Sequence, residues 1–419
     1  MADNEEKLVR MLKYVSEHND FYKNRIKEYG ITNPLDITQW PVLTRKELQE
    51  NRYNMFSDGY KSKYFNQQLR RQSSSGSTGM PVNVYWDYKD WYASNMCLWR
   101  KRREWYGIKP GDRYCVFTLN AFGIIPEEGK IYYINDPKNI LSFNVSLIRD
   151  EHGYEQMAEK INEFKPDWLY IQPFVLNQLI RAYVKLGLDP VKTIRYIESV
   201  GEILTSDLRR RAEELFGVRV TDMYGSEEMN GIAMENPDGD MQIFNDNVLL
   251  EVKNEGGIST CGEGEAIITN LNNFAMPLIR YEQGDLIDVY TLYKPDEFLC
   301  TITLLTIRQI KGRLIETIIV NKEFEINPLM ILEIMAGVIN EYIGILLWYK
   351  FDFFKSNNEL RCTIKIDKNK QHWSLNIKQT IEKEFRRIIP HESDLLLNVV
   401  FSDNDNANGN KNTILKLTE

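Results

Sequence analysis

The sequence predicts an α/β protein: a large N-terminal domain with parallel sheets and a smaller antiparallel layer, followed by a small α+β domain. Its 419 residues exceed what one ordinary hydrophobic core accommodates. In the middle of the chain, strand-length apolar segments alternate with amphipathic helical segments, which is typical of a parallel sheet with right-handed crossovers. The pattern changes after Gly312-Arg313, and we expect the second domain to begin there.

The composition excludes several classes of protein. Hydrophobic residues make up 43% and charged residues 27% of the chain, as in folded globular proteins. The net charge of −8 argues against a nucleic-acid partner, and no apolar run approaches the roughly 20 residues of a membrane-spanning helix. The chain starts with a charged, amphipathic stretch rather than a signal peptide. Five scattered cysteines without a CxxC pair indicate core residues in a reducing, cytoplasmic environment.

The first predicted elements are helical. Apolar residues recur at helical spacing over residues 5–29, and a short helix is expected over 44–48 after a proline-containing segment. The side chains of residues 82–86 follow the alternating pattern of a β-strand. Helices are then predicted over 154–164, 174–186 and 206–216, and strands over 168–172, 194–200 and 218–224.

From Glu251 onward, glycines interrupt the apolar segments, which predicts short strands in an antiparallel layer. Beyond residue 312 the pattern predicts a helix over 328–340, strands over 346–354 and 359–366, a helix over 375–389 and a strand over 395–401. We therefore predict two domains, 1–312 and 313–419. The polar residues 402–410 are expected to form a mobile loop.

Residues 73–81, SSSGSTGMP, are the most informative segment. Their hydroxyl groups and glycine backbone N–H groups suit polyphosphate oxygens, although no Gly-Lys-Ser/Thr closes a Walker loop. A flexible Ser/Gly linker is the alternative interpretation. The strand predicted directly after this segment favours a loop that is tied into the fold.

Three further segments carry candidate binding residues. Residues 222–228, DMYGSEE, lie at the carboxyl end of the third predicted parallel strand, the edge at which α/β sheets bind ligands. Gly201-Glu202 ends the second strand in the same way. Residues 277–285 place Asp285 after a turn glycine, where its carboxylate suits a sugar diol, and residues 310–313 read IKGR. Each segment alone is also compatible with an ordinary turn.

Together, in this order and spacing, the four segments resemble the adenylate-forming superfamily of acyl-CoA synthetases. The likeness is strongest to the phenylacetate–CoA ligase branch and its capsular-polysaccharide (CapK-like) relatives. Phe21-Tyr22 and the phrase PVLTRKEL at residues 41–48 also resemble this branch. The resemblance covers almost the whole chain and becomes thinner after Arg313.

The resemblance implies ATP-dependent activation of a small-molecule carboxylic acid to an acyl-adenylate with release of pyrophosphate, with Mg²⁺ and a mobile C-terminal lid. A carboxylate is already ionised at neutral pH and needs no general base, in agreement with four scattered histidines. Coenzyme A is the expected acyl acceptor, as in aryl- or arylacetate-CoA ligases. The alternatives are transfer to an amine, hydroxyl or carrier protein in a polysaccharide or secondary-metabolite pathway, and a non-catalytic nucleotide-binding protein on the same fold. Homodimers are common in this branch.

The resemblance also assigns residues. The β/γ-phosphate loop would comprise Ser74, Ser75, Gly76, Ser77, Thr78 and Gly79. The adenine pocket would be lined by Gly201, Glu202, Asp222, Met223, Tyr224 and Gly225. Asp285 would bind the ribose hydroxyls. The catalytic residues would be Lys411, Arg313 and Glu228, of which Glu228 would help to hold Mg²⁺.

The sequence departs from the family pattern at several places, three of which concern the candidate site, the hinge and the mobile lysine. Glu227 stands where the family has a phosphate-binding Thr, and Ile315 stands at the hinge, where a polar residue is usual. Asn410 and Ile414 replace the Gly and Arg that flank the mobile lysine, and Lys416 is the second candidate for that lysine. These departures keep the non-catalytic alternative open.

Overall fold

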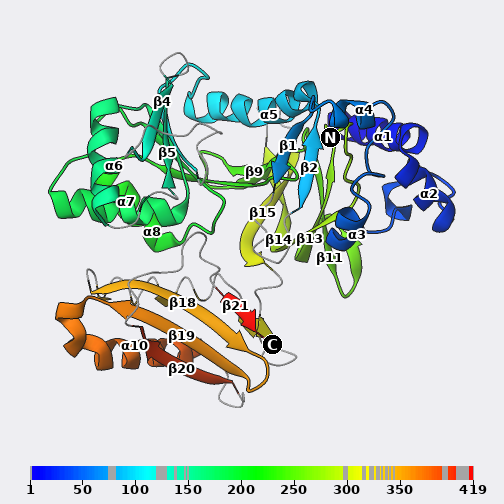
Figure 1. Ribbon diagram of the computed structural model, residues 1–419. Coiled ribbons are helices and arrows are strands. Elements are labelled where there is room, and N and C mark those ends of the chain that lie inside the picture. Colours follow the sequence, from blue (N-terminus) through cyan, green and yellow to red (C-terminus); the bar gives the residue numbers. More distant parts are fainter. Residues whose placement is uncertain are drawn as a thin grey trace. The chain divides into compact units, whose positions relative to one another are not determined.

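The computed structural model describes residues 2–73, 82–118, 130–135, 139–145, 148, 151–295, 301–313, 318–319, 325–326, 331, 334–335, 338, 341–342, 345–388, 395–402 and 415–418. The chain forms two compact units (Figure 1). Unit 1 contains residues 1–110 and 221–310, and unit 2 contains residues 111–220 and 311–419. Both contain helices and sheets, so the predicted α/β fold class is confirmed.

The helices of unit 1 precede its main sheet in the chain. They are α1 (Ala2–His18), α2 (Asp20–Glu28), the 3₁₀ turn η1 (Ile37–Gln39), α3 (Arg45–Glu50), α4 (Tyr60–Phe65) and α5 (Tyr88–Tyr106). The helical pattern over residues 5–29 is divided at Asn19. Its side-chain oxygen accepts a hydrogen bond from the Tyr22 N–H, which makes it the N-cap of α2.

In the main sheet of unit 1, every strand pair whose register the structure describes is antiparallel. Its strands are β8 (Val220–Ser226), β9 (Asn230–Glu235), β10 (Met241–Ile243), β15 (Thr301–Arg313), β14 (Tyr281–Pro295), β13 (Gly262–Asn270), β11 (Val248–Asn254) and β12 (Gly257–Ser259), given in spatial order. The strands β1 (Arg70–Ser73) and β2 (Asn83–Trp86) pair antiparallel and form a separate two-stranded sheet.

The expectation of short strands after Glu251 is wrong for β14 and β15, which have 15 and 13 residues. Gly256 lies in the turn between β11 and β12, but Gly262, Gly264 and Gly284 lie within or at the end of a strand. At Gly264, in β13, an added Cβ would stand 2.2 Å from the Lys253 carbonyl oxygen of β11. This glycine therefore permits close approach of two paired strands.

Unit 1 has one hydrophobic cluster that joins its helices to its sheet. Buried residues of α1 and α2, such as Met11 and Tyr22, pack with Trp86 of β2 and with Tyr281 of β14. Residues from both stretches of unit 1, 1–110 and 221–310, thus share one core.

In unit 2, the predicted strands 168–172 and 194–200 are β6 (Trp168–Ile171) and β7 (Tyr196–Val200), and they pair parallel as expected. The third predicted strand, 218–224, is β8, which pairs antiparallel with β9. The strand order within unit 2 is β7, β6, β3 (Tyr114–Thr118), β5 (Ile140–Asn144) and β4 (Tyr132–Asn135), and only the edge strand β4 pairs antiparallel. The helices α6 (Glu151–Phe164), α7 (Pro173–Leu186) and α8 (Ser206–Phe216) agree with the prediction within three residues at each end. Their apolar faces and the strands form a second cluster.

The C-terminal residues form a four-stranded sheet with a third hydrophobic cluster. Its order is β20 (Leu396–Phe401), β19 (Glu359–Ile366), β18 (Leu346–Phe354) and β21 (Leu415–Thr418). The helix α10 (Ser374–Ile388) packs on it, a short 3₁₀ segment η5 (Lys368–Trp373) precedes that helix, and β16 (Ile318–Ile319) pairs with β17 (Glu325–Ile326). The third cluster uses only residues between 318 and 399. This supports a domain boundary near 312, which stays a prediction.

Two predicted C-terminal elements lie largely outside the described residues. The helix over 328–340 falls mostly outside them, and the loop over 402–410 lies outside them from residue 403 onward. Among the described helices, none is long and apolar enough to cross a bilayer.

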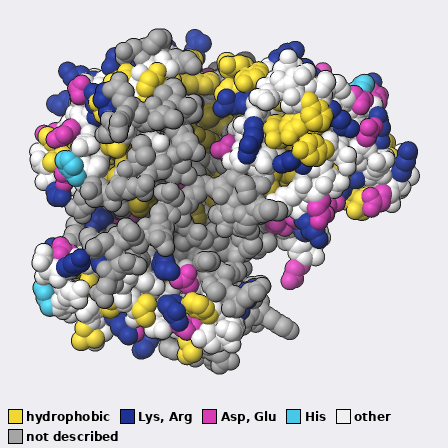
Figure 2. Space-filling view, in the orientation of Figure 1, with side chains coloured by type: hydrophobic (Ala, Val, Ile, Leu, Met, Phe, Trp, Pro, Cys, Tyr) yellow, Lys and Arg dark blue, Asp and Glu magenta, His cyan; other side chains and the backbone are white. Residues whose placement is uncertain are grey.

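Hydrophobic side chains are exposed on one part of unit 1. Figure 2 shows them near α4 and the start of α5, with Lys and Arg side chains around them. The exposed residues include Tyr53, Phe65, Tyr88, Tyr92 and Met96.

Candidate functional site

The β1–β2 hairpin presents the segment that was predicted to bind phosphate. Ser73 pairs with Asn83 at the end next to the connecting loop, so residues 74–82 join the two strands. Residues 74–81, including Ser74–Gly79, lie outside the described part of the chain. The stem of the hairpin is well packed, because Trp86 is fully buried and the Arg70 guanidinium lies 4.0 Å from the Trp91 ring centroid.

Gln72 joins this stem to the second predicted segment. Its Nε2 donates to Glu227 Oε2 at 3.2 Å and to Asn230 Oδ1 at 3.1 Å. Residues more than 150 positions apart in the sequence thus meet beside the predicted phosphate loop. Glu227, at the family's Thr position, is exposed and its carboxylate faces the hairpin stem.

The second and third predicted segments meet within the main sheet of unit 1. Asp222, Met223, Tyr224 and Gly225 lie on β8. The buried Tyr224 hydroxyl donates to Asp285 Oδ2 of β14 at 2.7 Å. At Gly225 an added Cβ would stand 2.6 Å from the Asn230 carbonyl oxygen, so this position has no room for a side chain.

A network of amides and hydroxyls fixes the turn between β8 and β9, which contains Glu228. Asn230 adopts a left-handed conformation with φ of 60° and donates to Ser94 Oγ of α5 at 3.0 Å. Ser94 donates to Asn247 Oδ1 at 2.8 Å. The Asn247 amide in turn donates to the carbonyl oxygens of Met229 and Gly231. The backbone on both sides of the turn is therefore held by buried side chains.

Glu228 itself is almost fully buried, with 3% of its side chain exposed. The Arg45 Nη1 lies 3.7 Å from its Oε1. Arg45 is the first residue of α3, and its N–H donates to Glu282 Oε1 at 3.0 Å. Burial raises the pKa of Glu282, and this hydrogen bond opposes the rise.

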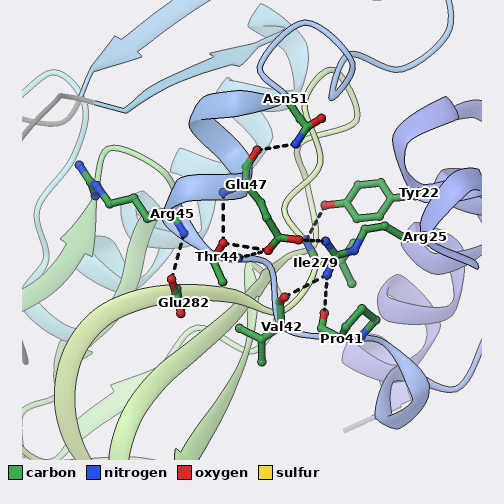
Figure 3. Close-up of polar contacts among 10 residues, drawn as sticks. All are labelled: Tyr22, Arg25, Pro41, Val42, Thr44, Arg45, Glu47, Asn51, Ile279 and Glu282. Carbon is green, nitrogen blue, oxygen red and sulfur yellow. Dashed lines mark hydrogen bonds and ion pairs between the residues drawn. The ribbon is translucent and has the colours of Figure 1, made fainter. Parts of the chain in front are cut away.

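Figure 3 shows how the segment that carries Arg45 is fastened. The Thr44 hydroxyl caps α3 and the Glu47 carboxylate reaches back to the Thr44 N–H at 2.8 Å, which completes a capping box. The buried Arg25 guanidinium pairs with Glu47 and donates to the Val42 carbonyl oxygen at 3.0 Å.

The Tyr22 hydroxyl connects the same region to the third predicted segment. It donates to the Pro277 carbonyl oxygen at 2.9 Å and accepts from the Ile279 N–H at 3.1 Å. The segment that precedes α3 also continues into the sheet, since Leu43 bridges to Tyr281. The Phe21-Tyr22 and PVLTRKEL phrases thus support the strand that carries Asp285.

The remaining predicted residues lie elsewhere. Gly201 and Glu202 follow β7 in unit 2, where Glu202 Oε2 accepts from the Phe174 N–H at 2.9 Å in the first turn of α7. Arg313 is the last residue of β15. Ile315 and Lys411 lie outside the described residues.

The donor set around Glu228 suits Mg²⁺ that enters together with phosphate. Among the described residues, no group of three or more His, Cys, Asp or Glu side chains could hold a metal by itself. Mg²⁺ is commonly bound by one or two carboxylates plus substrate phosphates. A buried carboxylate next to a cation, as at Glu228, fits such a site.

A family model described as AMP-binding enzyme matches residues 72–248, which include most of the hairpin, β7 and the β8–β9 turn. This stretch of the chain is therefore similar to AMP-binding enzymes. The matched range covers two of the predicted segments and Gly201-Glu202.

Curated relatives of this protein agree with the family model. It is 27% identical over 297 residues to phenylacetate-coenzyme A ligase of Pseudomonas putida, covering 67% of this chain and 64% of that ligase. It is 22% identical over 286 residues to protein CapK of Staphylococcus aureus, covering 66% of this chain and 60% of CapK. The alignments therefore span less than two thirds of the length of these relatives.

Solved structures agree on the fold. Crystallised 2-hydroxyisobutyryl-CoA ligase, in the postadenylation state with 2-HIB-AMP, matches with a TM-score of 0.70 at 18% identity. The match covers 98% of this chain and 88% of the ligase chain. The resemblance to adenylate-forming ligases that the sequence predicted is thus confirmed, as is the fold.

Proposed function

We propose that this protein uses ATP to activate a carboxylic acid as an acyl-adenylate, with release of pyrophosphate, and then transfers the acyl group to the thiol of coenzyme A. The match to the AMP-binding enzyme model and the phenylacetate-coenzyme A ligase relative support this reaction. An aryl or arylacetic acid is the proposed substrate class.

One observation carries the proposal. Three segments that are far apart in the sequence converge in unit 1: the stem of the predicted phosphate loop, the β8–β9 turn and the strand that contains Asp285. Gln72 links the first two, and the 2.7 Å hydrogen bond from Tyr224 to Asp285 links the last two. A nucleotide needs phosphate and ribose contacts from one rigid frame, which this arrangement can supply.

The chemistry explains why such a frame suffices for the first step. An ionised carboxylate oxygen attacks the α-phosphorus, the bond to the bridging oxygen of the β-phosphate breaks, and pyrophosphate leaves. This step needs positioning and charge neutralisation rather than a base. Bound Mg²⁺ would neutralise phosphate charge. We assign phosphate binding to Ser74–Gly79, the ribose hydroxyls to Asp285 and the metal-facing carboxylate to Glu228, while the roles of Gly201, Glu202 and Arg313 stay predictions.

The first experiment is pyrophosphate release from ATP and Mg²⁺ over a panel of aryl, arylacetic and aliphatic acids. Each acid is tested with hydroxylamine as the trap, and again with coenzyme A. We expect acid-dependent release and a thioester product that forms only with coenzyme A. A hydroxamate without any thioester would favour an amine, hydroxyl or carrier-protein acceptor. No release from any acid and no ATP binding would contradict the catalytic proposal.

Lys411 is the proposed mobile lysine that meets the acyl and phosphate oxygens. Replacing a charged group that stabilises the transition state costs about 10²–10³-fold in rate. We therefore expect Lys411→Ala to lower pyrophosphate release by about 100-fold while ATP binding is retained. Lys416→Ala is the matched control, because this second candidate lies on β21. Loss of activity in Lys416→Ala alone would reverse the assignment.

A further inference from the structure

We propose that Arg45 is a positioning residue for Glu228: it holds the buried carboxylate before the nucleotide arrives and prevents a divalent metal from binding there alone. The inference rests on the proposed function, because it takes Glu228 as the carboxylate that meets metal-bound ATP. It adds an order of binding, in which metal and phosphate enter together.

The first argument is the burial of Glu228. Only 3% of its side chain is exposed, and an ionised carboxylate at such a position needs a nearby cation. The Arg45 guanidinium, with Nη1 3.7 Å from Oε1, supplies a positive charge at that position. At this separation the pair is an electrostatic contact rather than a short hydrogen bond, so it can separate without losing an ideal geometry.

The second argument is that the Arg45 backbone is fixed while its side chain is partly exposed to solvent. The Thr44–Glu47 capping box holds the first turn of α3, and the Arg45 N–H is bonded to Glu282. The Arg45 side chain is 24% exposed, so its guanidinium reaches solvent. Its neighbour Lys46 is 82% exposed and pairs with Glu50 on the same helix, which makes Lys46 a suitable control.

These two facts have a consequence for metal binding. A guanidinium beside Glu228 repels a second cation, so the affinity for a bare divalent ion is low. ATP brings its metal together with phosphate oxygens, which are preferred partners of arginine. The guanidinium can then turn from Glu228 to phosphate while the carboxylate turns to the metal. Charge stays balanced throughout the exchange.

The test uses Mn²⁺ as the probe, since it shares the oxygen ligands of Mg²⁺ and is visible by electron paramagnetic resonance. Mn²⁺ binding is measured without nucleotide for the wild type, Arg45→Met, Arg45→Lys and Lys46→Met. We expect Arg45→Met to bind Mn²⁺ about tenfold more tightly than the wild type. Arg45→Lys and Lys46→Met should behave like the wild type. The double variant Arg45→Met/Glu228→Gln should lose the gain.

Two results would overturn the inference: equal Mn²⁺ affinity in the wild type and Arg45→Met, or a gain that persists in the double variant. Thermal unfolding shows whether Arg45→Met folds, and Arg45→Gln replaces it if it does not. Binding of Mn²⁺–ATP to the wild type is measured in parallel. If the wild type does not bind Mn²⁺–ATP, the proposed function is contradicted. If it binds Mn²⁺–ATP but Arg45→Met has the same affinity for Mn²⁺ alone as the wild type, only the role of Arg45 is contradicted.

Discussion

A hydrogen bond from Tyr224 orients the Asp285 carboxylate. Its Oδ2 accepts from the buried Tyr224 hydroxyl at 2.7 Å, and a carboxylate has several acceptor positions. It can therefore accept from a ribose diol while Tyr224 keeps it oriented. The hydrogen bond also brings together a Tyr and an Asp from two separate predicted segments.

Asp285→Asn should weaken ATP binding more than it weakens the fold. The amide oxygen still accepts from Tyr224, but hydrogen bonds between a charged carboxylate and ribose contribute about 1.5–3 kcal/mol. We expect the KM for ATP in pyrophosphate release to rise about tenfold or more, with a smaller rise for Tyr224→Phe. A fall in kcat at unchanged KM would argue that Asp285 does not bind the ribose.

The sequence predicts the segments of the candidate site but not the residues that hold them together. Gly225, Glu228 and Asp285 stand in recognisable patterns. Gln72 and Asn230 are isolated polar residues of types common on surfaces, and their partners are far away in the chain. Arg45 belongs to the PVLTRKEL phrase, which marked the region without indicating its partner Glu228. No local pattern encodes such long-range contacts.

At the scale of elements, the helix α3 depends on Glu47. Burial opposes ionisation of this carboxyl, but the hydrogen bonds from Thr44 and Arg25 outweigh it and lower its pKa. A lowered pKa in the folded state stabilises the protein above the usual Glu pKa of about 4.3. That stabilisation is lost as the pH falls through the lowered value.

Glu47→Gln should therefore destabilise the protein at neutral pH and less so in acid. Removing the charge leaves the buried Arg25 without its carboxylate, which costs about 2 kcal/mol. We expect the urea midpoint of the variant to lie below that of the wild type at pH 7, with a difference that narrows below about pH 4. Glu50→Gln is the control, since the Lys46–Glu50 pair is exposed and worth little. A difference that stays constant from neutral to acid pH would contradict this account.

Local sequence patterns predict the location of regular helices and strands. They do not predict a boundary that depends on the contacts of a single side chain. The period of apolar residues located α7, α8, β18 and β19 closely. It could not show that Asn19 divides α1 from α2, because the cap depends on contacts of its amide with Met55 and Ser57. The prediction that the glycines of β13 and β14 break strands is wrong for a similar reason. Their function depends on a neighbouring strand, as Gly264 shows against Lys253.

At the scale of the whole molecule, unit 1 is discontinuous in the sequence. It combines residues 1–110 with residues 221–310, and its hydrophobic cluster needs both parts. Local sequence patterns indicate where the character of the chain changes, as at residue 312. They do not indicate that residues 221–310 join the same unit as residues 1–110. The pairing that closes the unit is long-range.

Unfolding experiments can decide whether residues 313–419 are a domain of their own. Phe385 of α10 is fully buried, and its ring lies 5.4 Å from that of Phe351 in the third hydrophobic cluster. Phe385→Ala should cost about 3–5 kcal/mol through the cavity it leaves. Met157→Ala makes a comparable cavity in the second cluster.

If the boundary near 312 is real, calorimetry should show the two variants lowering different transitions, because the third cluster draws no residue from the second. A single transition lowered by both would mean that unit 2 unfolds as one body. The lid predicted by family resemblance would then lack an independent core. Since none of the residues proposed to bind ATP belongs to α10, ATP binding should survive Phe385→Ala in either case.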